Sequence, residues 1–276
     1  MKTGCIAYLT RSDERELAKL TKSLSLLQTH YLAEHPCDVI IFHEADLPAS
    51  RIIELAKASG ISAKCALVEF RYTHAGAPLL SKRDLGYRHM CRFFANELFQ
   101  RPELMDYEYY CRLDTDSYIL SPIVFDLFEF AKAQAVDYGY IAVVDDEPKF
   151  CHDLWATAEQ YINAHPEIPT YRKLYTEIPE AKCFYTNFEV CRLAWFRRPV
   201  WQDYFKHLDA TGGIFRHRWG DHVIRYIGVN LFIQQPQIHQ FRNIHYAHQG
   251  EFNVPGLRGF MRNCLSTSKR VIRRLV

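Results

Sequence analysis

The sequence lacks several features that would have assigned it to common classes of protein. Its nine cysteines lie scattered from Cys5 to Cys264 without a C-x-x-C pair, so neither a zinc site nor a complete disulfide framework is expected, and a reducing compartment is favoured. No run approaches the roughly 20 apolar residues that span a bilayer. No secretory leader precedes the first apolar segment, which begins near Gly4. We therefore expect a cytoplasmic or peripheral membrane protein.

Charge of one sign is also scarce. The chain contains 34 Lys and Arg against 32 Asp and Glu, which leaves a formal net charge of +2. This balance gives no basis for a polyanionic partner, and we expect no binding of nucleic acid. The hydrophobic share of 48% is ordinary for an α/β enzyme domain that buries one large core.

A glycine-rich phosphate loop is missing, although the first 70 residues alternate between strand and helix patterns. Apolar runs near residues 4–9, 39–42 and 65–70 predict buried parallel strands, and amphipathic patterns between them predict helices. Thr10-Arg11-Ser12 follows the first strand where a G-x-G-x-x-G loop would stand. An ordinary dinucleotide site is therefore not expected. The pattern predicts an α/β fold with a Rossmann-like half, in which a mononucleotide could bind at the strand ends.

Acidic residues close two predicted strands. Asp114-Thr115-Asp116 follows an aromatic strand that begins at Tyr107, and Asp145-Asp146-Glu147 follows a strand over residues 138–144. Hard cations such as Mg²⁺ and Mn²⁺ prefer oxygen ligands and share them with phosphates, so this pattern is typical of a metal that carries a diphosphate. An Asp-x-Asp motif alone can equally be a turn or a helix cap.

Two further carboxylates admit two interpretations each. Glu189 lies in a strand-like aromatic context, where a carboxylate is costly to bury unless it is paired or functional. It could attack an anomeric carbon, or it could pair with Arg192 or Arg197. Asp221 could belong to a site or cap a helix that begins at His222.

The basic and aromatic candidates for site residues also admit two interpretations. His248 could complete a carboxylate metal site, but a lone histidine is more often an ordinary surface or core residue. Tyr87, Arg88 and Arg112 could contact phosphate or sugar, or could be helix and strand residues with satisfied polar tips.

The C-terminal tail combines basic and apolar residues. Within the tail of residues 251–276, apolar side chains alternate with lysine and arginine from Arg258 to Val276, which is typical of a basic amphipathic surface helix. We predict one catalytic domain over residues 1–250, followed by this tail. The tail is a possible peripheral membrane contact, and the alternative is a solvated terminal helix.

Four separated motifs occur in one order along the chain. They are Tyr107–Asp116, Phe184–Glu189, Gly212–Asp221 and Phe241–His248. Their order and character resemble the fungal α-1,2-mannosyltransferases of glycosyltransferase family 15, over about residues 4–248. The resemblance implies a GT-A fold, a Rossmann-like nucleotide-binding half with a mixed central sheet. It also implies retaining transfer of mannose from GDP-mannose with Mn²⁺ or Mg²⁺.

The resemblance also assigns roles to single residues. The expected catalytic residues are Glu189, Tyr87 and Asp221, with Glu189 as the candidate nucleophile. The expected donor-binding residues are Thr10, Arg11, Arg88, Arg112, Asp114 and Asp116. The expected metal ligands are Asp146, His248, Asp114 and Asp116. The family strand ends in Arg-Val-Glu-Pro-Asp where this chain has Arg112-Leu113-Asp114-Thr115-Asp116, so which of the two aspartates reaches the metal stays open.

The resemblance also implies a function. We predict transfer of mannose to a mannoside, glycan or lipid-linked acceptor with an α-1,2 linkage. The alternatives are a GT-A enzyme that uses a UDP-hexose and a non-catalytic carbohydrate-binding protein. Retention requires either a glycosyl-enzyme on a carboxylate such as Glu189, or a front-face substitution in which a diphosphate oxygen is the base. Family members usually carry a membrane anchor for the Golgi lumen, which is the alternative compartment.

Overall fold

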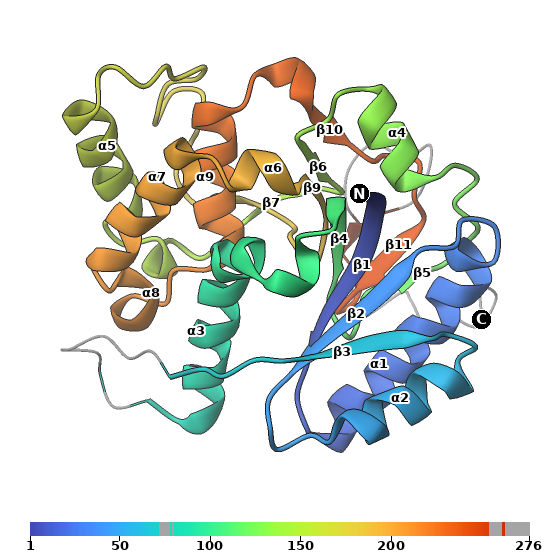
Figure 1. Cartoon of the computed structure of the whole chain (residues 1–276). Coiled ribbons are helices and arrows are strands. Elements are labelled where there is room, and N and C mark those ends of the chain that lie inside the picture. Colours follow the sequence, from blue (N-terminus) through green and yellow to red (C-terminus); the bar gives the residue numbers. More distant parts are fainter. Residues whose placement is uncertain (72–77, 79, 254–260, 263–276) are drawn as a thin grey trace.

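A mixed seven-stranded sheet forms the centre of the molecule (Figure 1). The computed structural model describes residues 1–71, 78, 80–253 and 261–262. The strands lie in the order β10, β6, β9, β4, β1, β2, β3, with the respective bounds Ile238–Gln240, Tyr138–Tyr140, Phe188–Arg192, Tyr107–Leu113, Lys2–Thr10, Asp38–His43 and Ala63–Leu67. Strands β3, β2, β1 and β4 run parallel to one another.

The Rossmann-like half is confirmed as a β1-α1-β2-α2-β3 unit, with α1 at Glu14–Leu27 and α2 at Ala49–Ala58. Helix α1 begins where the Asp13 carboxylate accepts hydrogen bonds from the backbone amides of Arg15 and Glu16. Its apolar side chains recur at helical spacing and are buried against the sheet. These buried residues are Leu17, Leu20, Leu24 and Leu27. The period of the sequence pattern therefore buries one face of α1 against the sheet.

Strand β9 makes the sheet mixed, as predicted. It runs antiparallel to both of its neighbours, β4 and β6. Its register places Glu189 opposite Arg112 of β4 and opposite Tyr140 of β6. Strand β9 thus joins the Rossmann-like half to β6 and β10.

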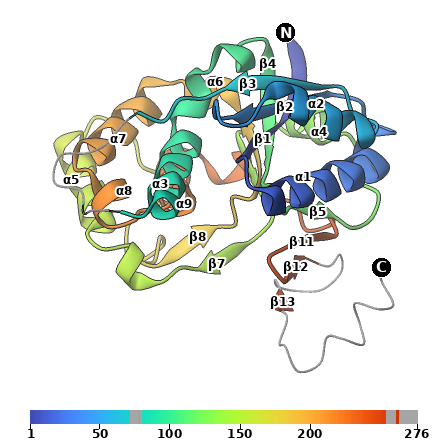
Figure 2. The same ribbon diagram turned by 90° about the horizontal axis from the view of Figure 1, so that it is seen from below.

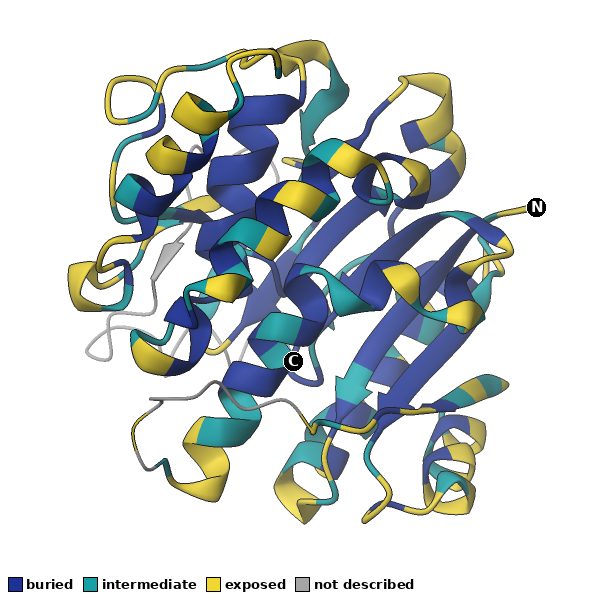
Figure 3. Ribbon diagram, turned by 60° about the vertical axis from the view of Figure 1, so that its left-hand side comes forward, coloured by how far each residue is buried: buried dark blue, intermediate teal, exposed yellow. Residues whose placement is uncertain are grey.

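A helical lobe packs on the other side of the molecule from α1 and α2 (Figure 2). Its helices are α3 (Lys82–Ala95), α5 (Leu154–Ala164), α6 (Leu193–Phe196), α7 (Pro199–Ala210), α8 (Gly213–Arg216) and α9 (Asp221–Phe232). Helix α9 is buried over most of its length. The helices turn their exposed residues outward, while the strands between them are almost wholly buried (Figure 3).

Short strands at the ends of the main sheet carry the remaining motifs. One small sheet has the order β13, β12, β11, β5, with bounds Met261–Arg262, Glu251–Asn253, Tyr246–His248 and Tyr118–Ile119. A hairpin pairs β7 (Val143–Asp145) with β8 (Lys182–Phe184). Helix α4 (Leu127–Ala133) contacts β1 and β9. These pieces bring residues near 116, 146 and 248 to the same end of the molecule.

The described residues bear on the predictions about disulfides and membrane-spanning segments. All eight cysteines in the described part of the chain are free thiols. No helix among the described residues combines the length and apolarity needed to cross a bilayer. The predicted amphipathic tail lies largely outside the described residues.

The Asp38 carboxylate ties the amino-terminal ends of four strands together. Its Oδ2 accepts hydrogen bonds from Tyr107 Oη at 2.6 Å and Lys64 Nζ at 3.1 Å, and it pairs with Lys2. Burial alone would raise the pKa of Asp38, but Lys2, Tyr107 and Lys64 together lower it to about 2.

Replacing Asp38 with asparagine is expected to reduce the loss of stability in acid. Because the folded-state pKa lies below the ordinary value of 3.8, this group stabilises the fold above that pH. The contribution disappears as the pH falls through about 2. Urea unfolding midpoints at pH 7, 4 and 2.5 should therefore converge between wild type and Asp38→Asn as the pH falls. A constant difference between the two proteins at all three values would contradict this account.

Candidate active site

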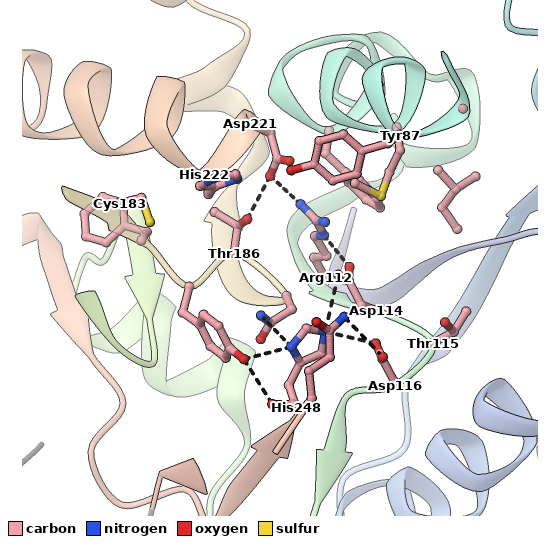
Figure 4. Close-up of a pocket in the computed structure, with 18 of the residues that line it drawn as sticks. Tyr87, Arg112, Asp114, Thr115, Asp116, Cys183, Thr186, Asp221, His222 and His248 are labelled. Atoms are coloured by element: carbon pink, nitrogen blue, oxygen red, sulfur yellow. Dashed lines mark hydrogen bonds and ion pairs between the residues drawn. The ribbon is translucent and has the colours of Figure 1, made fainter. Parts of the chain in front are cut away.

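A cavity of about 660 Å³ opens where strand ends of the main sheet meet the helical lobe. The end of β1, the start of α1 and the end of β4 form one side of it. Helix α3, the β7–β8 hairpin, the start of α9 and β11 form the rest. The residues that line it come from parts of the chain as distant as Thr10 and His248 (Figure 4). The Rossmann-like half and the helical lobe therefore share one pocket.

A carboxylate–imidazole pair forms one side of this pocket. His248 Nε2 lies 2.9 Å from Asp116 Oδ1 and 3.9 Å from Asp114 Oδ2. Burial alone would raise the pKa of Asp116, but His248 and Lys19 lower it to about 2. Asp116 is therefore ionised at neutral pH and is ready to bind a cation.

The environment of His248 fits a divalent cation. Its buried Nε2 is close to the Asp116 carboxylate but is not aligned for a hydrogen bond to it or to any other described residue. The Tyr185 hydroxyl lies 2.8 Å from Nδ1 and donates to the His248 carbonyl oxygen at 3.1 Å. Metal-binding histidines are commonly oriented by such a contact on the second ring nitrogen. Asp116 and His248, with Asp114 beside them, thus form a donor set that a cation and phosphate oxygens could complete.

Arg112 links this pair to the other side of the pocket. Its guanidinium lies 3.6 Å from the centre of the Phe94 ring. Nε donates to Asp114 Oδ1 at 2.8 Å, and a terminal nitrogen donates to Asp221 Oδ2 at 2.6 Å. Burial opposes ionisation of Asp221, but the Arg112 charge and a hydrogen bond from Thr186 lower its pKa. A chain of charges therefore runs from Asp114 to Asp221 through one buried arginine.

Asp221 and Tyr87 line the same side of the pocket. Asp221 is the first residue of α9, so its carboxylate lies near the positive end of that helix dipole. The Tyr87 hydroxyl points toward Asp221 (Figure 4). Burial, reinforced by the nearby charge of Asp221, raises the pKa of Tyr87, which keeps its hydroxyl protonated. The two groups can donate and accept hydrogen bonds to a sugar that enters the pocket beside them.

Thr10 and Arg11 reach the pocket from the end of β1. Arg11 pairs with Glu16 at 3.3 Å, and Lys19 pairs with Glu16 at 3.0 Å and with Asp116 at 3.4 Å. The sequence interpretation missed Lys19 and Glu16. They lie on the α1 face that turns toward the pocket, and the i,i+3 spacing of Glu16 and Lys19 on a helix was the available signal.

The predicted four-ligand metal set does not come together. Asp146 Oδ2 is 3.0 Å from His222 Nε2, and Asp146 Oδ1 accepts the amide of Glu147 at 2.8 Å. Burial opposes ionisation of Asp146, but His222 lowers its pKa. His222 and His248 lie on separate sides of the pocket (Figure 4). No three His, Cys, Asp or Glu side chains in the described part of the chain are gathered closely enough to hold a metal ion. Asp114 lies 3.9 Å from the His248 imidazole, so Asp116 and His248 would need oxygens of a bound ligand to complete the coordination of a cation.

Asp146 is thus corrected from a ligand beside His248 to the partner of His222. The physical reason is that the β7–β8 hairpin directs Asp146 toward the start of α9 and away from β11. His222, which the sequence interpretation treated only as the beginning of a helix, is a pocket residue.

Glu189 does not line the pocket, contrary to its predicted role as a nucleophile. Its side chain is fully buried, and Oε2 lies 3.2 Å from Arg225 Nε of α9. Oε1 accepts a hydrogen bond from the Tyr110 hydroxyl. The interpretation of Glu189 as the partner of an arginine is the one that this geometry supports. The arginine is Arg225, and not the predicted Arg192 or Arg197, because β9 turns Glu189 toward α9.

Arg88 is also outside the pocket lining. Its guanidinium donates to the carbonyl oxygens of Phe215 and Asp84, each at 3.1 Å. The bond to Phe215 holds α8 against α3, and the bond to Asp84 stays within α3. The predicted contact of Arg88 with the donor is therefore replaced by a bond between helices.

The arrangement of the sheet and helices is the GT-A fold of glycosyltransferases. Two solved structures share the fold at 23% and 21% identity, with TM-scores of 0.80 and 0.81. They are core-mannan synthase A of Aspergillus fumigatus in its Mn/GDP form and the mannosyltransferase Ktr4p of S. cerevisiae in complex with GDP. They cover 93% and 92% of this chain, which in turn covers 77% and 73% of theirs.

Residues 67–270 match the model of the glycolipid 2-alpha-mannosyltransferase family, and the chain belongs to this family. Probable mannosyltransferase KTR3 of Saccharomyces cerevisiae is 34% identical over 61% of this chain and 44% of its own length. Glycolipid 2-alpha-mannosyltransferase of the same yeast is 29% identical over 74% of this chain and 45% of its own length. The chain thus spans less than half the length of these curated relatives.

Proposed function

We propose that this chain transfers mannose from GDP-mannose to a mannoside, glycan or lipid-linked acceptor, with retention, and forms an α-1,2 linkage. The observation that carries the proposal is the Asp116–His248 pair at 2.9 Å, placed between the strand ends of the Rossmann-like half and the Tyr87–Asp221 side of the pocket. Family membership and the mannosyltransferase names of the relatives support the same donor sugar.

In this proposal GDP-mannose extends along the pocket from the strand ends to the helical lobe. The nucleoside lies near Thr10 and Arg11 at the strand ends, where nucleotides bind in open α/β sheets. The diphosphate reaches the pair formed by Asp116 and His248. The mannose then lies against Tyr87 and the helical lobe.

Asp116 and His248, with Asp114 beside them, would hold Mn²⁺ or Mg²⁺. When bound, the cation supplies Lewis-acid stabilisation of charge on the departing diphosphate. The solved relative in an Mn/GDP form supports this choice of cation. Arg112 keeps Asp114 in place through its bond to that carboxylate.

The front-face route suits the position of Glu189 better than a glycosyl-enzyme on that residue. A nucleophile must touch the anomeric carbon, whereas both oxygens of Glu189 are engaged in the core. In the front-face route the bond from the anomeric carbon to the phosphate oxygen breaks. The acceptor oxygen bonds to the same face, and its proton passes to a phosphate oxygen of GDP. Tyr87 and Asp221 orient the sugar during this exchange.

Incubation of the chain with GDP-mannose, Mn²⁺ and a panel of mannosides tests the proposal. We expect release of GDP that depends on both the acceptor and the cation, and a product whose linkage analysis shows an α-1,2 bond. Turnover of a UDP-hexose instead would favour the alternative donor. Binding of mannosides without release of GDP would favour a non-catalytic carbohydrate-binding protein.

A peripheral membrane contact through residues 251–276 is a second, separate proposal, and it would place the enzyme near lipid-linked acceptors. Its support is the alternation of basic and apolar residues in the sequence. Co-sedimentation with anionic liposomes should decrease when residues 266–276 are deleted. Equal binding by the full and the shortened chains would remove the tail from this role. The cytoplasmic compartment and its Golgi alternative stay predictions.

A further inference from the structure

Arg218 occupies a strained position at the rim of the pocket. It lies in the turn between α8 and α9 with a φ of 66°, in the left-handed region that residues other than glycine seldom adopt. The side chain lines the pocket. Strain of this kind is found most often at functional sites, where the surrounding structure holds the residue in place.

The packing of two glycines holds this turn. Gly212 has a φ of 69° and precedes α8. A Cβ on Gly213 would lie 2.3 Å from the Trp219 ring, so only glycine allows the indole to pack there. Trp219 Nε1 also donates to the carbonyl oxygen of His152 at 2.7 Å. The residue just before this anchored tryptophan is Arg218, which is therefore presented from a fixed backbone.

Two aromatic rings fix the guanidinium of Arg218. Its Cζ lies 4.1 Å from the centre of the Tyr87 ring and 4.2 Å from the centre of the Phe150 ring. Cation–π contacts on both rings restrict the orientation of the plane. The N–H donors of a guanidinium lie in that plane and point away from the rings.

Those donors have no protein partner in the described part of the chain, in which Arg218 makes no hydrogen bond and no ion pair. Two other arginines near the pocket differ in this respect. Arg112 is committed to two carboxylates, and Arg88 to two backbone carbonyls. Arg218 is thus a preoriented donor group on the lining of a cavity.

The position of Arg218 favours the acceptor over the nucleotide. Its aromatic partners belong to the helical lobe and to the loop after β7, whereas the strand ends proposed for the nucleotide belong to β1 and β4. Its charge acts on Asp146 and Tyr87, on the side of the pocket that holds His222. The Asp116–His248 pair lies on another side (Figure 4).

We propose that Arg218 is a specificity-determining residue that binds hydroxyl groups of the acceptor mannoside, with Phe150 and Tyr87 keeping its planar fork in position. A planar fork suits a pair of neighbouring hydroxyls, and aromatic side chains beside it offer apolar surface to a sugar ring. This inference rests on the proposed function, which it deepens by placing the acceptor.

Kinetics of the complete chain with Arg218→Gly and Arg218→Lys test the inference. Glycine suits the left-handed backbone, so Arg218→Gly keeps the turn while it removes the fork. We expect KM for a mannoside to rise about 10-fold or more, as for loss of hydrogen bonds to a charged group. Calorimetry with GDP and Mn²⁺ should give a Kd within about 2-fold of wild type. Arg218→Lys, which keeps the charge without the fork, should rescue little of the loss.

Arg216→Ala is the matched control, because this exposed arginine lies two residues earlier and outside the pocket lining. It should leave both constants unchanged. A rise in the Kd of GDP equal to the rise in KM would overturn the inference by assigning Arg218 to the donor phosphates. An unchanged KM in Arg218→Gly would overturn it as well.

Direct binding separates this inference from the proposed function. Saturation-transfer NMR measures contact between methyl α-mannoside and the protein in the presence of GDP and Mn²⁺. Binding by wild type that Arg218→Gly weakens supports the inference even if no mannose is transferred, in which case the proposed function alone fails. Absence of binding by wild type overturns the inference.

Discussion

Replacing His248 with alanine is expected to weaken the Mn²⁺-dependent binding of GDP about 100-fold. His248 Nε2 lies 2.9 Å from Asp116 and has no hydrogen-bond partner among the described residues, so the substitution removes one of the two closest donors of the proposed cation site. Loss of a contact that merely orients a metal ligand costs about 10- to 100-fold, and loss of the ligand itself should reach the upper end. Calorimetric titration of GDP with and without Mn²⁺ measures the effect.

A neighbouring histidine provides the control for this experiment. His245 lies three residues earlier, outside the pocket lining. His245→Ala should bind GDP and Mn²⁺ as wild type does. The weak affinity of His248→Ala for GDP without metal should equal that of wild type without metal. If His248→Ala keeps its full response to Mn²⁺, the cation is held elsewhere, and Asp146 with His222 becomes the next candidate.

Replacing Glu189 with glutamine is expected to destabilise the fold by about 3–5 kcal/mol, because it leaves the Arg225 guanidinium buried without a counter-charge. Both side chains are fully buried, and the guanidinium is further enclosed by the rings of Phe99, Phe196 and Trp201. Urea unfolding monitored by tryptophan fluorescence measures the loss. Glu108→Gln is the comparison, since Glu108 is a partly exposed carboxylate on the adjacent strand, and it should cost under about 1 kcal/mol.

A double variant separates stability from chemistry at this position. Glu189→Leu combined with Arg225→Met removes both charges, and replacing a whole buried pair by apolar residues is often neutral or stabilising. We expect this variant to regain stability and to recover much of the transfer activity. A stable double variant that transfers no mannose would return Glu189 to the mechanism as the nucleophile.

Local patterns predicted the fold well, because they depend on neighbours in the sequence. The alternation of apolar runs and amphipathic segments placed β1, α1, β2, α2 and β3 in order and indicated a parallel arrangement. The acidic residues after β4 and the pocket position of Asp221 also followed from the sequence. His248 depended on the resemblance to a family, since a single histidine carries no pattern of its own.

The sequence could not show which side chains far apart in the chain contact one another. The partner of Glu189 lies 36 residues away on α9. Asp146 and His222 are separated by 76 residues, and Arg88 and Phe215 by 127. No periodicity records which of several nearby arginines or histidines will meet a given carboxylate. Glu189 and Arg88 were therefore assigned to the pocket, whereas the tertiary structure directs Glu189 into the core and Arg88 toward α8.

The location of β11 also has a consequence for the order of folding. Strand β11 carries His248 but belongs to the small sheet with β5, outside the seven strands of the main sheet. The main sheet ends at Gln240 in the sequence, so it can assemble before residues 246–248 dock. The capacity to bind a cation is then acquired last. A ligand that binds only the docked form stabilises that final step by mass action, so added Mn²⁺ and GDP should protect the β11 amides from hydrogen exchange more than those of β1.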